Sequence, residues 1–185
     1  MRIGTEGDAG DSIILMGLIS KLPDGPHDLV LQQSAVTKSK TPEQLVAFHR
    51  IFSPLAESQS YIKSCTTGTL GSTEWDSGGF RGAGLHNNSE TLFQAVKSHL
   101  IASLGIGHNL TSDKPWLKVE PSKRTEGRVI IARSDRYRND LFPWDAVVKF
   151  YGSQLLFIGT PTEHGRFCNE QGKVEYLPTQ DLLEA

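Results

Sequence analysis

The sequence predicts an α/β protein made of two successive units, in which strands pair in parallel and alternate with helices. Apolar runs of strand length alternate with segments that carry helix-start signals, a pattern typical of parallel sheets covered by helices. The strand–loop–helix order begins a second time after Gly127. A length of 185 residues fits either one large domain or two small ones.

The first unit is expected to begin with a strand over MRIGT and a helix over DSIILMGLISKL. Asp11 or Ser12 is the predicted N-cap of this helix, and the turn Pro23-Asp24-Gly25 is its stop signal. The apolar segment DLVLQQS is predicted to be the second strand.

The second helix has the strongest start signal of the chain. In TPEQLVAFHRIFSPLAE, Thr41 is the predicted cap, Pro42 takes the first helical position and Gln44 completes a capping box. A third strand is expected over YIKSCTTGTL, followed by the Gly-rich, irregular segment GSTEWDSGGFRGAGLHNN. The helix SETLFQAVKSHLIASLG follows, with Ser89 as its cap and Gly105 as its end.

The second unit is expected after the extended segment PWLKVEPS and the linker SKRTEG. Its predicted strands are RVIIARS, QLLFIGT and VEYL. A helix over PWDAVVKFYG starts with Pro143, PTEHGRFCNEQG is a loop running into a short helix, and Thr179 caps a last helix over PTQDLLEA. Three strands are a thin sheet for an independent core, so we expect the second unit to be incomplete.

Composition and charge argue against several classes of protein. A net charge of -2 gives no overall attraction to nucleic acid or to a membrane surface. Cys65 and Cys168 lie far apart in the sequence, which suggests neither a disulfide framework nor a metal site, and we expect a reduced, cytoplasmic protein. Glu6 and Asp8 stand where a signal peptide would be apolar, and no apolar stretch is long enough to span a bilayer.

The loop between the first strand and the first helix carries three carboxylates, Glu6, Asp8 and Asp11. Loops of this shape usually bind phosphate through bare N–H groups and the positive helix end, and three carboxylates would oppose that. Two other uses remain open. Either Asp11 caps the helix and Asp8 is a solvated turn residue, or a carboxylate at the sheet edge takes a proton from an attacking hydroxyl. The positive helix end favours the ionised carboxylate, which weakens it as a base.

The opening GDAGDSIILMGLI resembles the N-terminal loop and first helix of the ADP-heptose–lipopolysaccharide heptosyltransferase family. The stretches VIIARSDRYRNDLFPW, LLFIGTPTEHGRF and VEYLPTQDLLEA are similar to the start of that family's donor-binding domain, and KPWLKVEP to the crossing between its domains. This resemblance implies a GT-B architecture of two Rossmann-like domains. Residues 1–120 would bind the acceptor and residues 127–185 the nucleotide-sugar, with no required metal and no cofactor.

The resemblance also implies roles for individual residues. Asp11 matches the family's proposed general base, which would deprotonate an acceptor hydroxyl for an inverting attack on the sugar. In RSDRYRND, a hydroxyl and a cation would bind the donor phosphates, so Ser134, Arg136 and Arg138 are the candidates. The alternative is a solvated loop in which these arginines pair with neighbouring aspartates.

Two further pairs of candidates follow. The resemblance implies that Glu163 and His164 contact the base or ribose of the donor; the alternative for Glu163 is a helix-capping role. On the acceptor side the candidates are Asp8 and Arg81, the latter in a Gly-rich segment that is otherwise a plain surface loop.

Three functions therefore remain open. The first is an inverting glycosyltransferase that uses a nucleotide-sugar and a glycan or other hydroxyl acceptor. The second is a non-catalytic carbohydrate- or partner-binding relative without the donor half-site. Because the family's donor domain continues past the point where this sequence stops, we expect weak nucleotide-sugar binding. The third is an unrelated Rossmann-like enzyme with a nucleotide cofactor, which the acidic first loop opposes.

Overall fold

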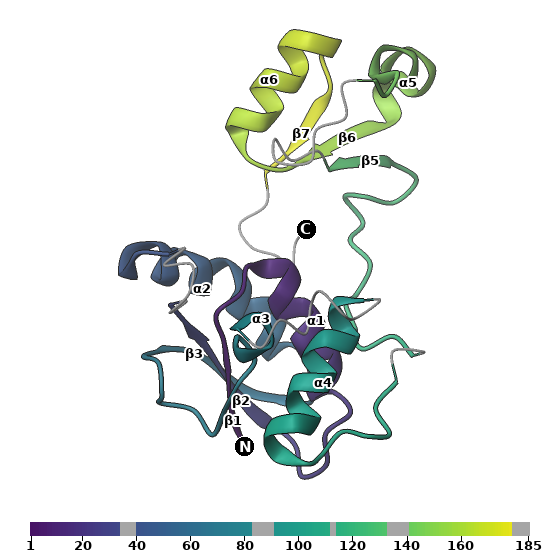
Figure 1. The fold of residues 1–185 in the computed structure, drawn as a ribbon. Coiled ribbons are helices and arrows are strands. Elements are labelled where there is room, and N and C mark those ends of the chain that lie inside the picture. The colour runs from purple at the N-terminus through teal and green to yellow at the C-terminus, as the bar shows by residue number, and fades with distance from the viewer. Residues whose placement is uncertain (34–39, 83–90, 112–113, 133–140, 179–185) are drawn as a thin grey trace. The chain divides into compact units, whose positions relative to one another are not determined.

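The computed structural model describes residues 1–33, 40–82, 91–111, 114–132 and 141–178. The chain divides into two compact units, Met1–Val119 and Glu120–Ala185. Each unit contains a parallel sheet with helices packed against it (Figure 1). The predicted α/β class with two parallel, Rossmann-like sheets is confirmed.

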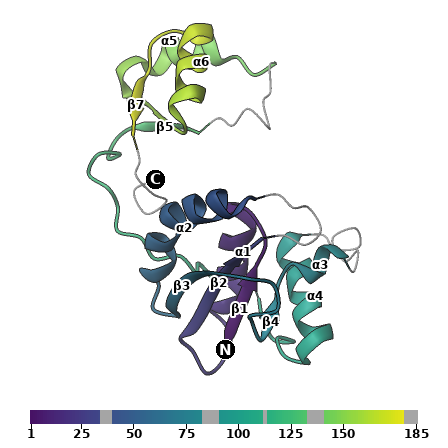
Figure 2. The ribbon, with the colours of Figure 1, turned by 90° about the vertical axis from the view of Figure 1, so that its left-hand side faces the viewer.

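The first unit is built on a four-stranded parallel sheet of order β3-β2-β1-β4, whose strands lie side by side in Figure 2. Its strands are β1 (Arg2–Thr5), β2 (His27–Gln32), β3 (Ile62–Gly68) and β4 (Trp75–Asp76). Its helices are α1 (Ala9–Ile19), α2 (Pro42–Glu57), α3 (Gly79–Gly82) and α4 (Leu92–Leu104). The short elements β4 and α3 lie in the Gly-rich segment, where the sequence predicted irregular structure.

Capping side chains set the starts of the longer helices. At α2 the predicted capping box is present: Gln44 N–H donates to Thr41 Oγ1 (3.3 Å), and Thr41 N–H donates to Gln44 Oε1 (2.8 Å). At α4 the cap is Thr91 and not Ser89, which lies outside the described residues. Gly105 ends α4 in the left-handed conformation as predicted, with φ of 69°.

Helix α1 begins earlier than the sequence suggested. Asp8 occupies the N-cap position and the Ser12 N–H donates to the Asp8 carbonyl (3.0 Å), which closes a first turn that already contains Asp11. The Ser12 hydroxyl is turned to the sheet, 3.4 Å from Thr5 Oγ1. The prediction that Asp11 or Ser12 caps the helix is therefore wrong, and Asp11 is a first-turn residue.

The core of the first unit lies on one face of its sheet. Ile3, Leu29, Cys65 and Trp75 lie in register across the four strands, and all four are buried. Trp75 reaches α4, where its Nε1–H donates to Ser103 Oγ (2.7 Å). Burial raises the pKa of the Cys65 thiol to about 12, so this cysteine is an inert core residue.

The opposite face is covered by the β3–β4 crossover, residues 69–74. Gln32 is 1% exposed and its Nε2 donates to the Thr69 carbonyl (2.8 Å), which fixes the crossover over the sheet. A Cβ at Gly4 would lie 2.5 Å from Gln32 Oε1. Gly4 is therefore needed for close packing beneath Gln32.

The segment that leaves the first unit is bound to α1 and to the end of α2. Trp116 Nε1–H donates to the Ile13 carbonyl (3.1 Å), and its ring lies so close to Gly17 that a Cβ there would be 2.9 Å away. The side-chain amide of Gln59 pairs with the main chain of Lys118, accepting from its N–H (2.9 Å) and donating to its carbonyl (3.1 Å).

Replacing Trp116 tests this attachment. We expect Trp116→Ala to lower the free energy of unfolding by about 2–4 kcal/mol, because it removes both ring packing and the bond to Ile13. Lys118→Ala is the matched control and should change it by less than about 0.5 kcal/mol, since only its main chain is used. Urea denaturation followed by circular dichroism measures both, and equal effects would contradict the proposed attachment.

His27, the first residue of β2, is buried with 1% of its surface exposed. Burial lowers the pKa of His27 below its ordinary 6.5, and the N-terminal ammonium of Met1, 3.5 Å from Nδ1, lowers it further. Folding thus favours the neutral imidazole of His27, whereas the unfolded chain binds a proton at about pH 6.5.

The stability of the protein should therefore depend on pH through His27. The contribution of His27 to the free energy of unfolding is complete above about pH 6.5. It declines as the pH falls below that value, because the unfolded state binds the proton more readily than the folded state does. Melting midpoints measured across this range should fall less steeply in His27→Gln. If the melting midpoint falls equally steeply with pH in the wild type and in His27→Gln, groups other than His27 cause the loss of stability.

The second unit has a three-stranded parallel sheet of order β5-β6-β7. Its elements are β5 (Val129–Ala132), α5 (Trp144–Tyr151), β6 (Leu155–Ile158), α6 (Pro161–Gln171) and β7 (Glu175–Leu177). Its buried core consists of Ile131, Leu155, Phe157, Phe167 and Val174. The three strands predicted for this unit are confirmed.

Two details of the second unit differ from expectation. The predicted loop before α6 is helical from Pro161, because Thr160 and Glu163 form a capping box. Pro143 occupies the N-cap position of α5 and not its first helical position. The helix expected after Thr179 lies outside the described residues.

Candidate functional site

The loops that follow the four strands of the first unit lie at the carboxyl edge of its sheet, where α/β proteins place their ligands. Glu6, Asp8 and Asp11 follow β1, and Asp76 ends β4. Lys40 lies before α2, on the connection from β2. The edge thus gathers carboxylates from two strands and an ammonium group from a third.

Lys40 joins the first two of these loops. Its Nζ lies 2.8 Å from Asp8 Oδ1 and donates to the Gly7 carbonyl (2.9 Å). The ammonium also lies over the ring of Phe48, 4.9 Å from the centroid. The Lys40 side chain is 10% exposed and that of Asp8 67%, so the pair reaches from the interior to the surface. Lys40 therefore fixes the acidic loop and compensates one of its charges.

Asp11 is held against the backbone of the same loop. A Cβ at Gly7 would overlap the Asp11 side chain and would lie 2.7 Å from its Oδ2, so the carboxylate occupies the space that the glycine leaves free. Gly10, by contrast, has no atom within 4 Å of a Cβ position. The glycine spacing of the opening segment therefore reflects separate packing demands at Gly4 and Gly7.

The loop after β4 lies beside the acidic loop. The carboxylate carbon of Glu6 lies 2.7 Å from where a Cβ of Gly78 would stand. The Gly78 N–H donates to Asp76 Oδ1 (2.8 Å), and His99 Nε2 is 3.0 Å from the Asp76 carbonyl. Asp76 is thus held by neighbouring groups and the Glu6 side chain lies close to Gly78, so the negative charge at this edge is concentrated around β1 and β4.

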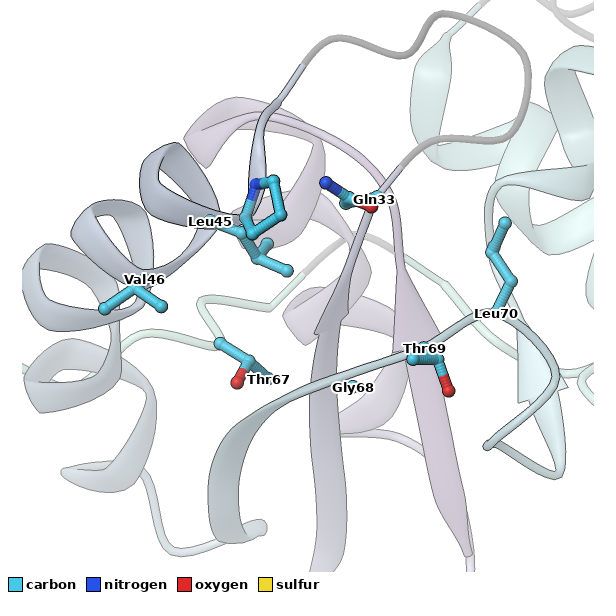
Figure 3. Close-up of a pocket in the computed structure, with 8 residues that line it drawn as sticks. Gln33, Leu45, Val46, Thr67, Gly68, Thr69 and Leu70 are labelled. Carbon is cyan, nitrogen blue, oxygen red and sulfur yellow. The ribbon is translucent and has the colours of Figure 1, made fainter.

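A pocket of about 360 Å³ opens at the same edge, between the start of α2 and the end of β3. In Figure 3, Leu45 and Val46 on α2 face the chain from Thr67 to Leu70, and Gln33 lies between them. The pocket is lined by Gln33, Pro42, Leu45, Val46, Thr67, Gly68, Thr69 and Leu70. Its volume lies in the range of small-molecule sites, about 300–1,000 Å³. Gln33 Nε2 donates to the Lys40 carbonyl (2.9 Å), which connects the pocket to the acidic loop.

The residues predicted for the acceptor side lie in this unit. Asp8 is paired with Lys40, and Asp11 lies in the first turn of α1. Arg81 belongs to the short helix α3 after β4. The candidates for donor phosphates, Ser134 and the two arginines at 136 and 138, lie outside the described residues.

Glu163 and His164 are both used inside the second unit. Glu163 Oε2 accepts from the Thr160 N–H (2.9 Å) and hydroxyl (2.7 Å), which is the capping role considered from the sequence. His164 Nε2 lies 2.8 Å from the Val174 carbonyl, and its ring stacks on Tyr176 with centroids 4.8 Å apart. Contact of either residue with a donor remains a prediction.

Comparisons of the chain with protein-family models, with curated proteins and with solved structures find no match. The fold establishes an α/β protein with parallel sheets. Among the described residues, no three His, Cys, Asp or Glu side chains are grouped so that they could hold a metal ion. In the same part of the chain, no helix is both long and apolar enough to cross a membrane.

Sequence reasoning missed Lys40 and the pocket. Lys40 stands directly before the Thr41 cap, so its position at a strand–helix junction was the available signal. The pocket had no such signal, because it forms only where the start of α2 meets the end of β3.

The packing of Asp11 on Gly7 gives a test with a built-in control. Gly7→Ala should destabilise the protein by about 1–3 kcal/mol, because the added methyl group must displace the Asp11 side chain. Gly10→Ala places the same methyl group in open space inside α1 and should stabilise by about 0.5–1 kcal/mol. Thermal melting measures the stability of both variants. If the two substitutions shift the melting midpoint in the same direction, the packing of Asp11 on Gly7 is contradicted.

Proposed function

We propose that this protein is an inverting glycosyltransferase of the two-domain GT-B type, similar to the heptosyltransferases, whose first unit binds the acceptor. The observation that carries the proposal is the position of Asp11. It lies in the first turn of α1, at the carboxyl edge of β1, packed on Gly7 beside the Lys40–Asp8 pair. The 360 Å³ pocket at the same edge offers room for a ring.

In the proposed reaction the Asp11 carboxylate accepts the proton of an acceptor hydroxyl. The acceptor oxygen forms a bond to the anomeric carbon while the bond to the nucleoside diphosphate breaks on the opposite side. The diphosphate leaves with the electron pair, and the sugar configuration inverts. Gly7 allows Asp11 to lie close to the loop, and Lys40 fixes the loop in place.

The donor side of the proposal rests on the resemblance. Ser134, Arg136 and Arg138 would bind the diphosphate, and Glu163 and His164 would contact the base or ribose. Arginine forks suit phosphate oxygens, which supports the choice of the 133–140 segment for this role.

One observation favours a second function, a non-catalytic carbohydrate- or partner-binding protein of the same fold. Glu163 and His164 both have partners within their own unit, in the α6 capping box and at the Val174 carbonyl. Contacts within the unit thus account for both side chains without a bound donor.

Replacing the proposed base distinguishes these functions. With ADP-, GDP- and UDP-sugars and simple glycoside acceptors, we expect Asp11→Asn to lower turnover about 10²–10⁴-fold while the melting midpoint changes little. Release of nucleoside diphosphate measures turnover, and the anomeric configuration of the product by NMR tests inversion.

Asp145→Asn is the matched control, because Asp145 also lies in the first turn of a helix, α5. It should leave turnover unchanged. Wild-type turnover in Asp11→Asn would exclude Asp11 as the base, and the absence of transfer from all three donors would favour the binding function.

A further inference from the structure

We infer that the first unit carries a second ligand site, at the amino edge of its sheet, for a small organic amine. The ligand combines a primary ammonium group, an apolar body and a hydrogen-bond acceptor. This edge is opposite the one that carries the acidic loop, and the inference is independent of the proposed transferase. It is carried by a pocket that two carboxylates and a buried imidazole line together.

The pocket has a volume of about 420 Å³, which lies in the range of small-molecule sites. Its wall combines the start of the chain, the turn between α1 and β2, the residue before β4 and the end of α4. In Figure 1 the N-terminus and the end of α4 lie at this same end of the unit. The lining residues are Met1, Pro23, Asp24, His27, Glu74, Leu104 and Ile106.

The imidazole of His27 points to a polar atom in the ligand. The residue is 1% exposed, and within the described part of the chain its Nε2 has no hydrogen-bond partner. The Leu22 carbonyl lies near enough to favour the charged form of the ring, yet it does not complete a hydrogen bond with Nε2. Nδ1 lies 3.5 Å from the Met1 nitrogen, which only donates, so the hydrogen of the neutral ring is on Nε2. A buried N–H without an acceptor is costly, and an acceptor atom of a ligand would satisfy it.

The turn beside this nitrogen leaves space at Gly25. A Cβ at Gly25 would lie 3.5 Å from His27 Nε2 and 3.6 Å from Cδ2 of the same ring. Apart from the chain neighbours of Gly25, no other atom lies within 4 Å of that position. A methyl group there would fill the space beside Nε2 without a clash, so Gly25→Ala is a means of blocking it.

The charged groups of the lining favour a cationic ligand. Asp24 and Glu74 both belong to the lining, and the Asp24 carboxylate lies near enough to His27 to act on the charge of the ring. The N–H of Arg2 donates to Glu74 Oε1 (3.1 Å), which holds this carboxylate at the amino edge. The Met1 ammonium lies on the Nδ1 side of the imidazole, and the two carboxylates outnumber it. An ammonium group of the ligand is therefore attracted to the side of the pocket that carries the carboxylates.

The spacing of the polar groups favours an organic cation over a metal ion. Asp24, His27 and Glu74 line one pocket, but they are not grouped closely enough to hold a metal ion together. A ligand that reaches all three must extend across the pocket and meet its apolar wall. The apolar wall consists of Pro23, Leu104 and Ile106. An amine with a hydrocarbon body and an acceptor at its other end has the chemistry that this lining requires.

Titration of the isotope-labelled full chain with four compounds of one length tests the inference at neutral pH. The compounds are 6-aminohexan-1-ol, hexylamine, hexane-1,6-diol and 6-hydroxyhexanoate. We expect 6-aminohexan-1-ol to shift the amide signals of the pocket in ¹H–¹⁵N spectra, namely those of Asp24, His27, Glu74, Leu104 and Ile106. The diol and the hydroxy acid should bind at least about tenfold more weakly, because they lack the ammonium group. Hexylamine should bind at least about threefold more weakly, because it has no acceptor for the Nε2–H of His27.

Conservative variants locate the bound amine. Asp24→Asn and Glu74→Gln should each weaken the binding of 6-aminohexan-1-ol about two- to fivefold. Both variants should fold, because asparagine tolerates the φ of 61° at position 24 and glutamine keeps the acceptor for the Arg2 N–H. Gly25→Ala should remove the advantage of the amino alcohol over hexylamine. Glu126→Gln, at an exposed glutamate outside the first unit, is the matched control and should leave all four affinities unchanged.

Several results would overturn the inference. One is equal binding of hexylamine and the amino alcohol by the wild type, and another is equal or tighter binding of the diol or the hydroxy acid. The absence of shifts at these amides with both amines, or unchanged binding in both carboxylate variants, has the same consequence. Because the readout is amine binding and not sugar transfer, failure of this inference leaves the proposed function untouched, and the reverse also holds.

Discussion

The carboxyl edge of the first unit depends on one buried ammonium group. Lys40 contacts the Gly7 carbonyl and Asp8 on one loop, while its own carbonyl receives the Gln33 amide from the end of β2. A lysine that is 10% exposed needs a negative partner, because desolvation of an unpaired charge is costly. The acidic loop supplies that partner. The same contact therefore satisfies the lysine, orders the loop and reduces the repulsion among its carboxylates.

Two glycines make this arrangement possible by leaving space rather than by adopting unusual backbone. Gly7 accommodates the Asp11 side chain on one side of the loop. Gly4 accommodates Gln32, which in turn holds the β3–β4 crossover over the sheet. Because that crossover leads from the pocket to β4, the packing at Gly4 links the pocket wall at Thr69 to the strand that carries Asp76.

Local chemistry explains which features the sequence predicted. The α2 capping box needs only Thr41, Pro42 and Gln44, which are neighbours in the chain, so it was predictable. The start of α1 was not predictable from neighbouring residues. Asp8 is the N-cap, and the Ser12 hydroxyl, which was a candidate for that position, lies against Thr5 on the sheet. The Lys40 contacts and the pocket join segments far apart in sequence, and such contacts have no signature in a single chain. The role predicted for Asp11 as a base follows from a resemblance. Its packing on Gly7 depends on where α1 begins, which the sequence did not predict.

The charges at the carboxyl edge of the first unit differ from those of a phosphate-binding site. Phosphate-binding α/β proteins keep the first loop bare and leave a helix start open, so that backbone N–H groups face the anion. In this unit the first loop is filled by carboxylates, and the start of α2 is closed by Pro42, the Thr41 cap and Glu43. Among the residues of this unit that the structure describes, both features act against the binding of a diphosphate. The acceptor that we propose for this unit is hydroxylated, and its hydroxyl groups can donate hydrogen bonds to carboxylates.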